Sequence, residues 1–98
     1  MVVILRVIVI YDISNDSVRL RVAERLKGFG LTRVQRSAFV GPGGSGLAKD
    51  IARMTRRLIN EKVDSLIIFI VPDKSVEEAI VVGTAMGSLY TCPRIRIL

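Results

Sequence analysis

The sequence of 98 residues contains no histidine and a single cysteine, Cys92. Without histidine, the chain has no imidazole base, no Ser-His-Asp triad and no histidine metal ligand. One cysteine excludes an intrachain disulfide and a zinc site built only from the cysteines of one chain. The sequence therefore excludes the common hydrolytic mechanisms that depend on imidazole.

Long hydrophobic runs are also missing. The apolar runs stop near ten residues, which is too short to span a bilayer. Residues 1–10 lack the basic start and the small-residue cleavage pattern of a signal peptide, and Arg6 interrupts them. The lone cysteine fits a reducing compartment. We therefore expect a soluble, cytoplasmic protein with no membrane partner.

Acidic residues are scarce relative to basic ones. The chain has 15 Lys and Arg against 9 Asp and Glu, a net charge of +6. Residues 1–62 hold twelve of the basic and five of the acidic residues, and eleven of all the cations are arginine. The planar guanidinium of arginine can donate two hydrogen bonds to phosphate oxygens and binds phosphate better than the ammonium of lysine. The excess of arginine therefore indicates a polyanionic partner. The alternative is a heat-adapted surface that prefers arginine and ion pairs.

The length allows one domain, which we place at residues 1–98. Half of the residues are apolar, as expected of a globular chain with a core. A domain this small is marginal alone, so we expect part of the apolar sequence to be buried against a second copy.

Hydrophobic periodicity predicts alternating strands and helices. The predicted elements are a strand at 2–11 buried on both faces, a helix at 17–27, extended residues at 31–41, a helix at 47–61, a strand at 65–71, a short strand at 80–83 and an edge strand at 94–98. Imperfect alternation at 35–37 predicts a bulge or two short strands. Residues 77–82 are ambiguous between helix and strand.

This order predicts an α+β fold, a ferredoxin-like βαββαβ sandwich with an extra C-terminal strand. Both helices would cover one face of an antiparallel sheet. We expect the other face to form a homodimer, with the surplus strand at 79–83 pairing with the partner's sheet edge. Residues 2–83 would form the core, and residues 84–98 a tail.

Asp12 directly follows the first predicted strand, so a rigid element would fix its position. Its carboxylate oxygens are hard ligands that suit Mg²⁺ or Mn²⁺. One carboxylate supplies few protein ligands for a metal ion. Two copies of Asp12 facing each other in a dimer would supply more and make a better site. A metal there would lower the pKa of a bound water and neutralise charge on a phosphate. The alternative is that Asp12 forms an Asx turn.

Two loops invite structural interpretations. Ser14, Asn15 and Asp16 are expected to cap the first helix. The glycine-rich segment 41–46 lacks the Lys-Ser/Thr pair of a phosphate loop, so we expect a mobile turn and no nucleotide hydrolysis.

Four arginines flank the ends of the first helix and second strand region and could line a phosphate track: Arg19, Arg21, Arg33 and Arg36. A solvated basic face is the alternative. The five aromatic residues do not form a pattern typical of a base-stacking platform, so contact with the nucleic-acid backbone is favoured over sequence reading.

Two motifs resemble a known family. The first is Tyr-Asp-Ile-Ser-Asn-Asp at 11–16, with Arg19 and Arg21 behind it. The second is Gly-Leu-Thr-Arg-Val-Gln-Arg-Ser-Ala-Phe-Val-Gly at 30–41. Over residues 2–83, the chain resembles the small CRISPR-associated endonucleases of the spacer-acquisition machinery, the second universal CRISPR-associated component.

The resemblance implies a ferredoxin-like homodimer that cleaves phosphodiester bonds of single-stranded RNA or duplex DNA in CRISPR adaptation and antiviral defence. It implies that Asp12 is the catalytic, metal-binding residue and that the cofactor is Mg²⁺ or Mn²⁺. It also implies a CRISPR integrase subunit as partner. The positions that match residues used near the metal centre are Tyr11, Arg19, Arg21, Arg33 and Phe39.

Two other functions stay open at this point. The chain could be a non-catalytic dimeric scaffold that binds duplex DNA and bridges integrase subunits. A ferredoxin-like regulatory domain for a small molecule is disfavoured by the basic excess. The segment 42–46 is richer in glycine than the family pattern, and residues 84–98 match no part of it.

Overall fold

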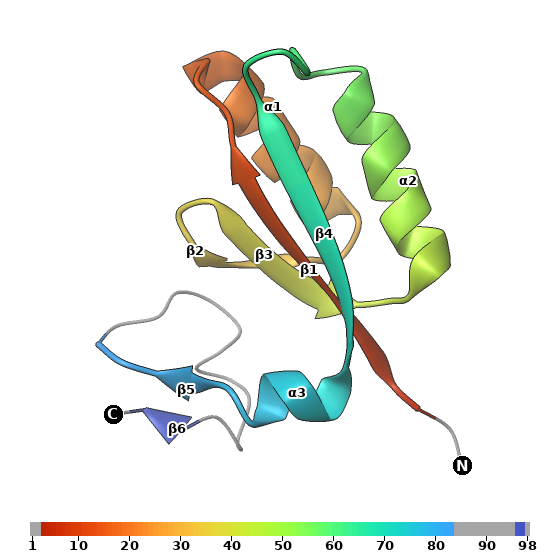
Figure 1. Ribbon diagram of the computed structural model, residues 1–98, viewed down its shortest axis with the longest axis vertical. Helices are drawn as coiled ribbons and strands as arrows, with labels where there is room; N and C mark the ends of the chain where they lie inside the picture. The colour runs from red at the N-terminus through yellow and green to blue at the C-terminus, as the bar shows by residue number, and fades with distance from the viewer. Residues whose placement is uncertain (1–2, 84–95, 98) are drawn as a thin grey trace.

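The computed structural model describes residues 3–83 and 96–97 and is shown in Figure 1. Predicted features of residues 1–2, 84–95 and 98 lie outside the described residues. The elements are β1 (Leu5–Asp12), α1 (Asp16–Gly28), β2 (Thr32–Gln35), β3 (Ala38–Pro42), α2 (Ser45–Arg56), β4 (Ser65–Pro72), α3 (Asp73–Glu77), β5 (Ile80–Val81) and β6 (Arg96–Ile97).

The first four strands form one antiparallel sheet in the order β2-β3-β1-β4. β1 is central and pairs along its whole length with β4, from Leu5 opposite Pro72 to Asp12 opposite Ser65. Strands far apart in sequence therefore lie side by side, as a ferredoxin-like βαββαβ layer requires. The predicted α+β fold class is confirmed.

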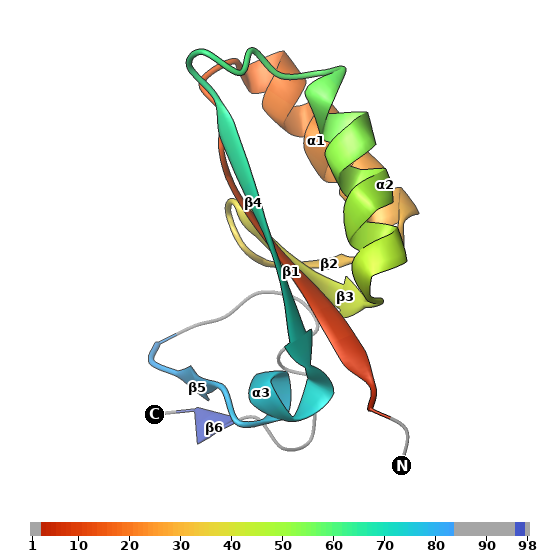
Figure 2. The same cartoon turned by 45° about the vertical axis from the view of Figure 1, so that its right-hand side comes forward.

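Both helices cover the same face of this sheet (Figure 2). Residues on β1 alternate between the two faces, and Val7, Val9 and Tyr11 are buried beneath the helices. Val22 and Leu26 of α1 complete this core with residues from α2 and β3. We call this face the helix side and the opposite face the open face.

On the open face, β1 is less buried than the sequence predicts. In the single chain, Ile8 is only partly buried and Ile10 is 45% exposed, so the strand is buried on one face and not on both. The sequence pattern is that of a strand with two apolar faces. The chain alone supplies cover for only one of them.

Helix boundaries follow from the capping residues. Asn15 is the N-cap of α1, where its side chain accepts a hydrogen bond from the backbone N–H of Val18, as the sequence predicts. α2 begins at Ser45 and ends at Arg56, so the predicted helix at 47–61 is displaced toward the N-terminus. Part of the glycine-rich segment 41–46 is therefore strand and helix, with Gly44 as the cap.

The hairpin of β2 and β3 contains the predicted irregularity. The segment forms two short strands, which was one of the predicted alternatives, and the register shifts between Arg33 and Gln35. Gly41 lies where the chain passes close to Gly30 and Leu31. A Cβ at Gly41 would come within 2.9 Å of backbone atoms of both residues.

At the opposite end from Asp12, α3 follows β4 directly, and β5 pairs in parallel with β6 as a separate two-stranded sheet. Arg6, which interrupts the first apolar run, forms an ion pair with Asp73 at the start of α3. Residues 77–82 prove to be a mixture of helix end and short strand. No helix in the described part of the chain is long and apolar enough to cross a membrane.

Candidate metal and nucleic-acid site

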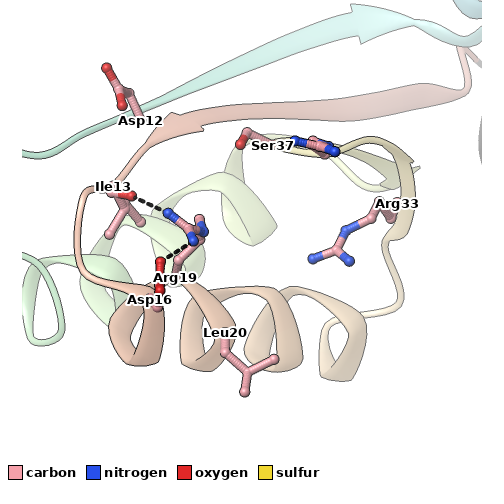
Figure 3. A pocket seen from close by; sticks show the side chains of 8 residues that line it. Asp12, Ile13, Asp16, Arg19, Leu20, Arg33 and Ser37 are labelled. Carbon is pink, nitrogen blue, oxygen red and sulfur yellow. Dashed lines mark hydrogen bonds and ion pairs between the residues drawn. The ribbon is translucent and has the colours of Figure 1, made fainter.

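Asp12 is the last residue of β1, and it is exposed. By strand alternation it shares the open face with Ile8 and Ile10. Figure 3 shows its side chain projecting away from the arginines on the other side of the sheet. The carboxylate is therefore held on a paired strand and presented to the open face.

The donor set of one chain is small. Among the described residues, no group of three His, Cys, Asp or Glu side chains could hold a metal ion. Mg²⁺ and Mn²⁺ are commonly held by one or two carboxylates, with water completing the shell. The exposed Asp12 carboxylate would match this requirement together with its copy from a second chain.

A cavity of about 600 Å³ lies beside the end of β1, between the start of α1 and the β2–β3 hairpin. We call it the arginine pocket. Figure 3 shows its residues. Its lining is Asp12, Ile13, Asp16, Arg19, Leu20, Arg33, Arg36 and Ser37. The structure thus gathers three of the four predicted phosphate-binding arginines around one hollow.

Arg33 is held by an aromatic ring. It lies directly opposite Phe39 in the β2–β3 ladder, and its guanidinium carbon is 5.2 Å from the centroid of that ring. Its Nε is buried and has no hydrogen-bond partner. Stacking orients the planar guanidinium and leaves its terminal N–H groups able to donate to a ligand.

Arg19 is already engaged. Its guanidinium donates to the backbone carbonyl of Ile13 at 3.0 Å and forms an ion pair with Asp16. These contacts fix the turn that follows Asp12 against the first turn of α1 (Figure 3). Arg19 therefore lines the pocket, but two of its contacts are already made within the chain.

The other predicted residues separate into two groups. Arg36 is exposed and lines the pocket, whereas Arg21 is exposed on α1 and is not part of the lining. The rings of Tyr11 and Phe39 stack with their centroids 6.2 Å apart, and both are almost completely buried. Phe39 lies beneath the Arg33 guanidinium and Tyr11 packs against Phe39, and a contact of either ring with nucleic acid stays a prediction.

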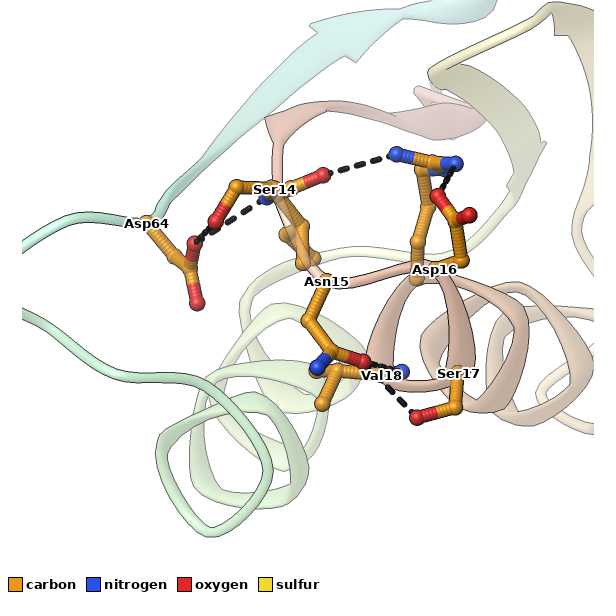
Figure 4. Close-up of polar contacts among 8 residues, drawn as sticks. Ser14, Asn15, Asp16, Ser17, Val18 and Asp64 are labelled. Carbon is orange, nitrogen blue, oxygen red and sulfur yellow. Dashed lines mark hydrogen bonds and ion pairs between the residues drawn. The ribbon is translucent and has the colours of Figure 1, made fainter.

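Sequence reasoning did not identify Asp64. Its carboxylate accepts hydrogen bonds from the backbone N–H of Ser14 at 3.2 Å and of Asn60 at 3.0 Å, and from the Ser14 hydroxyl (Figure 4). The N–H of Asn60 and then that of Ser14 lower the pKa of Asp64 below its usual value. Asp64 so joins the loop after Asp12 to the loop before β4. Its distance of 50 residues from Ser14 left no local signal in the sequence.

The fold and these residues define a class: a small ferredoxin-like protein with a carboxylate at the end of its first strand and a neighbouring basic pocket. Residues 5–79 match the model of the family described as CRISPR associated protein Cas2. The chain belongs to this family.

Two relatives match this chain over most of their own length. The chain is 38% identical over 92 residues to "CRISPR-associated endoribonuclease Cas2" of Aeropyrum pernix, covering 94% of this chain and 97% of the relative. A Cas2 endoribonuclease of Pyrobaculum aerophilum is 40% identical over 77 residues, which cover 79% of this chain and 85% of the relative. The crystal structure of a hypothetical protein from Thermus thermophilus superposes with a TM-score of 0.73 at 32% identity, over 86% of this chain and 96% of that one.

Proposed function

We propose that this protein is a metal-dependent endonuclease of CRISPR adaptation that acts as a homodimer in the cytoplasm. The observation that carries the proposal is the placement of Asp12, exposed at the end of a fully paired central strand. Two relatives whose lengths this chain largely covers are named endoribonucleases, which supports cleavage of nucleic acid.

The open face supports the homodimer. Ile10, Ile67 and Phe69 share this face and are 45%, 52% and 47% exposed. A contiguous apolar surface on a small domain favours association with a partner. Within the four-stranded sheet, β4 pairs only with β1, so its outer edge also offers unpaired backbone groups. A two-fold axis near the end of β1 would bring Asp12 of both chains together.

The side chains would divide the chemical work. Asp12 of the two chains would hold one Mg²⁺ or Mn²⁺, which supplies charge neutralisation and lowers the pKa of water when bound. The β1–β4 pairing keeps the carboxylate in place, so little reorganisation is needed when the phosphate arrives. The arginines attract the polyanionic strand toward this end of the sheet.

Substitution of Asp12 by Asn tests the proposal. We expect Asp12→Asn to lower cleavage of labelled single-stranded RNA or duplex DNA by at least about 100-fold, because a neutral amide binds a divalent cation poorly. EDTA should abolish cleavage by the original protein. Circular dichroism and gel filtration should be unchanged in the variant.

The matched control is Asp50→Asn. Asp50 is an exposed carboxylate on α2 that pairs only loosely with Arg53, at 3.5 Å. Its replacement should leave cleavage within about twofold of the original rate. Cleavage that survives in purified Asp12→Asn would contradict the proposed role.

A scaffold function is the second candidate, favoured by the basic ends of both helices. The last turn of α1 carries Arg25 and Lys27, and that of α2 carries Arg53 and Arg56. Such a surface would bind duplex DNA and present it to a CRISPR integrase subunit. This function predicts salt-sensitive DNA binding that Asp12→Asn leaves intact, whether or not cleavage occurs.

A further inference from the structure

The arginine pocket and the Asp12 carboxylate face different directions. Asp12 borders the pocket, but Figure 3 shows its carboxylate projecting away from Arg19 and Arg33. Strand alternation explains this, because Tyr11 points to the helix side and the next residue must point to the open face. A group bound within the pocket is therefore not the group bound at the carboxylate.

The pocket has the chemistry of an anion site. Among the described residues, neither Arg33 nor Arg36 forms an ion pair, so both guanidinium groups can pair with an incoming anion, and the Asp16 carboxylate of the same lining is paired with Arg19. Arg33 is in addition pre-oriented on Phe39 with a buried, unpartnered Nε. Ser37 adds a hydroxyl to the lining. The two guanidinium groups and this hydroxyl can all donate hydrogen bonds to the oxygens of a phosphate group.

The size of the pocket favours a phosphate that is part of a nucleic-acid strand. A volume of about 600 Å³ is far more than an isolated phosphate needs and accommodates the attached sugar and base. The apolar part of the lining, from Ile13 and Leu20, lies beside the charged groups. These features suit a nucleotide unit better than a free inorganic anion.

We infer that the arginine pocket is an anchoring site for a phosphate of the nucleic-acid strand other than the phosphate that is cleaved. The inference rests on the proposed function for the identity of the strand. The strand then passes around the end of β1, with one phosphate at Asp12 on the open face and another in the pocket on the helix side.

Binding measurements separate this site from catalysis. In an Asp12→Asn background, where the oligonucleotide stays intact, Arg33→Gln should weaken binding of a single-stranded RNA oligomer by about 10-fold or more, the usual effect of losing a charge-assisted contact. The matched control Lys74→Gln removes the same charge from an exposed side chain of α3, at the other end of β1, and should weaken binding by about twofold at most. Equal effects of the two substitutions would overturn the inference.

A second variant protects the test against misfolding. Arg33→Gln removes a residue packed on the core ring of Phe39, so its thermal melting must be compared with that of the original protein. Arg36→Gln changes an exposed residue of the same lining and should also weaken binding by several-fold. Normal binding by a folded Arg36→Gln and a folded Arg33→Gln would refute an anchoring site.

The ends of the oligomer distinguish two sources of the phosphate. We would compare the same RNA with a 5′-phosphate, a 3′-phosphate or hydroxyls at both ends. Loss of a preference for one phosphorylated end in Arg33→Gln would assign a terminal phosphate to the pocket. A uniform loss across all three oligomers would assign an internal phosphate, and both results support the anchor.

Cleavage kinetics then test that the anchored phosphate is not the cleaved one. With Asp12 intact, Arg33→Gln should raise KM by about 10-fold and leave kcat within about twofold, because a remote contact contributes uniform binding. A large fall in kcat with unchanged KM would place Arg33 at the cleaved phosphate and overturn the inference. If the original protein does not cleave at all, the proposed function fails while the binding experiment still decides the fate of the pocket.

Discussion

The two faces of the sheet are built from the same strands but for different purposes. On the helix side, Val7, Val9 and Phe39 are completely buried, and the arginine pocket opens at the edge of this core. On the open face, Ile10 and Phe69 are about half exposed and Asp12 follows at the end. Successive side chains of β1 point to opposite faces, so neighbouring residues of this strand belong to different faces.

This difference assigns separate tasks to the two faces. The helix side folds the chain and orients arginine, so its residues should be sensitive to any loss of volume. The open face is apolar but uncovered, so its residues should matter for the proposed homodimer and for the site that its two Asp12 side chains would share. Substitutions on each face can break this distinction or sharpen it.

The largest effect is expected from a charge on the open face. Phe69→Asp should weaken the proposed homodimer by at least about 1,000-fold, since burying an unpaired carboxylate in an apolar interface costs several kcal/mol. Analytical ultracentrifugation would measure the dissociation constant. Cleavage should fall with dimer content, and the variant should retain the circular dichroism of a folded chain.

A variant that stays dimeric with full activity would show that the open face has another purpose. Phe69→Leu is the control because it keeps an apolar side chain and should change the dissociation constant by less than about 10-fold. The melting temperature of the original protein should rise with its concentration, as expected when dimerisation is linked to folding.

Loss of volume on the helix side should lower stability at every concentration. Phe39→Ala removes the largest fully buried side chain and should lower the free energy of unfolding by about 3–5 kcal/mol. Urea denaturation measures this change. The same truncation at Phe69 should cost a monomeric chain about 1 kcal/mol or less, and equal costs at both sites would remove the distinction between the faces.

Gly41 tests how tightly the helix side is packed. A methyl group there would meet backbone atoms of Gly30 and Leu31 at 2.9 Å, which cannot move aside as a flexible side chain would. Gly41→Ala should therefore lower the free energy of unfolding by about 1–3 kcal/mol. Gly46→Ala is the control, because nothing lies within 4 Å of an added Cβ at that exposed helical position, and it should be neutral or slightly stabilising.

The smallest effect concerns the carboxylate that joins the two loops beside Asp12. The N–H donors of Asn60 and Ser14 lower the pKa of Asp64 in the folded chain below the ordinary value of 3.8. Its stabilising contribution is therefore present above that value and disappears as the pH falls through the folded pKa. Asp64→Asn should melt at a lower temperature than the original protein at neutral pH.

The pH dependence of melting provides the check. The difference between Asp64→Asn and the original protein should shrink when melting is measured near or below about pH 4. Asp50→Asn, on the exposed surface of α2, should show a smaller difference at neutral pH. A difference for Asp64→Asn that is constant with pH would exclude the charge of Asp64 as its cause.

Local patterns predicted much of the fold. The strand in the first apolar run, the cap at Asn15 and the division of 31–41 into two short strands each depend on neighbouring residues. The structure forms them as β1, the N-cap of α1 and the β2–β3 hairpin. The end of α2 was predicted five residues too late, because the apolar residues Leu58 and Ile59 continue the helical pattern while packing against the core from a turn. Hydrophobic periodicity indicates which residues are buried, and residues in a turn can be buried as well as residues in a helix.

The sequence offers candidate residues for a site, and the structure adds how they are arranged. The sequence indicates Asp12 and the arginines, but it does not show that Arg33 stacks on Phe39 or that Arg21 lies outside the pocket. These relations depend on strand register and on the packing of α1. Asp64 and Ser14 meet only because β1 and β4 pair, so no local pattern announces them.

The ends of β1 have one more consequence. Asp12, Asp64 and the arginine pocket gather at one end of the long central strand. Figure 1 shows α3 and the small β5–β6 sheet at the other end. Lengthening or remodelling the region near α3 would leave the loops around the carboxylate untouched. New segments added at that end would therefore change the surface there and leave the candidate site at the other end of β1 intact.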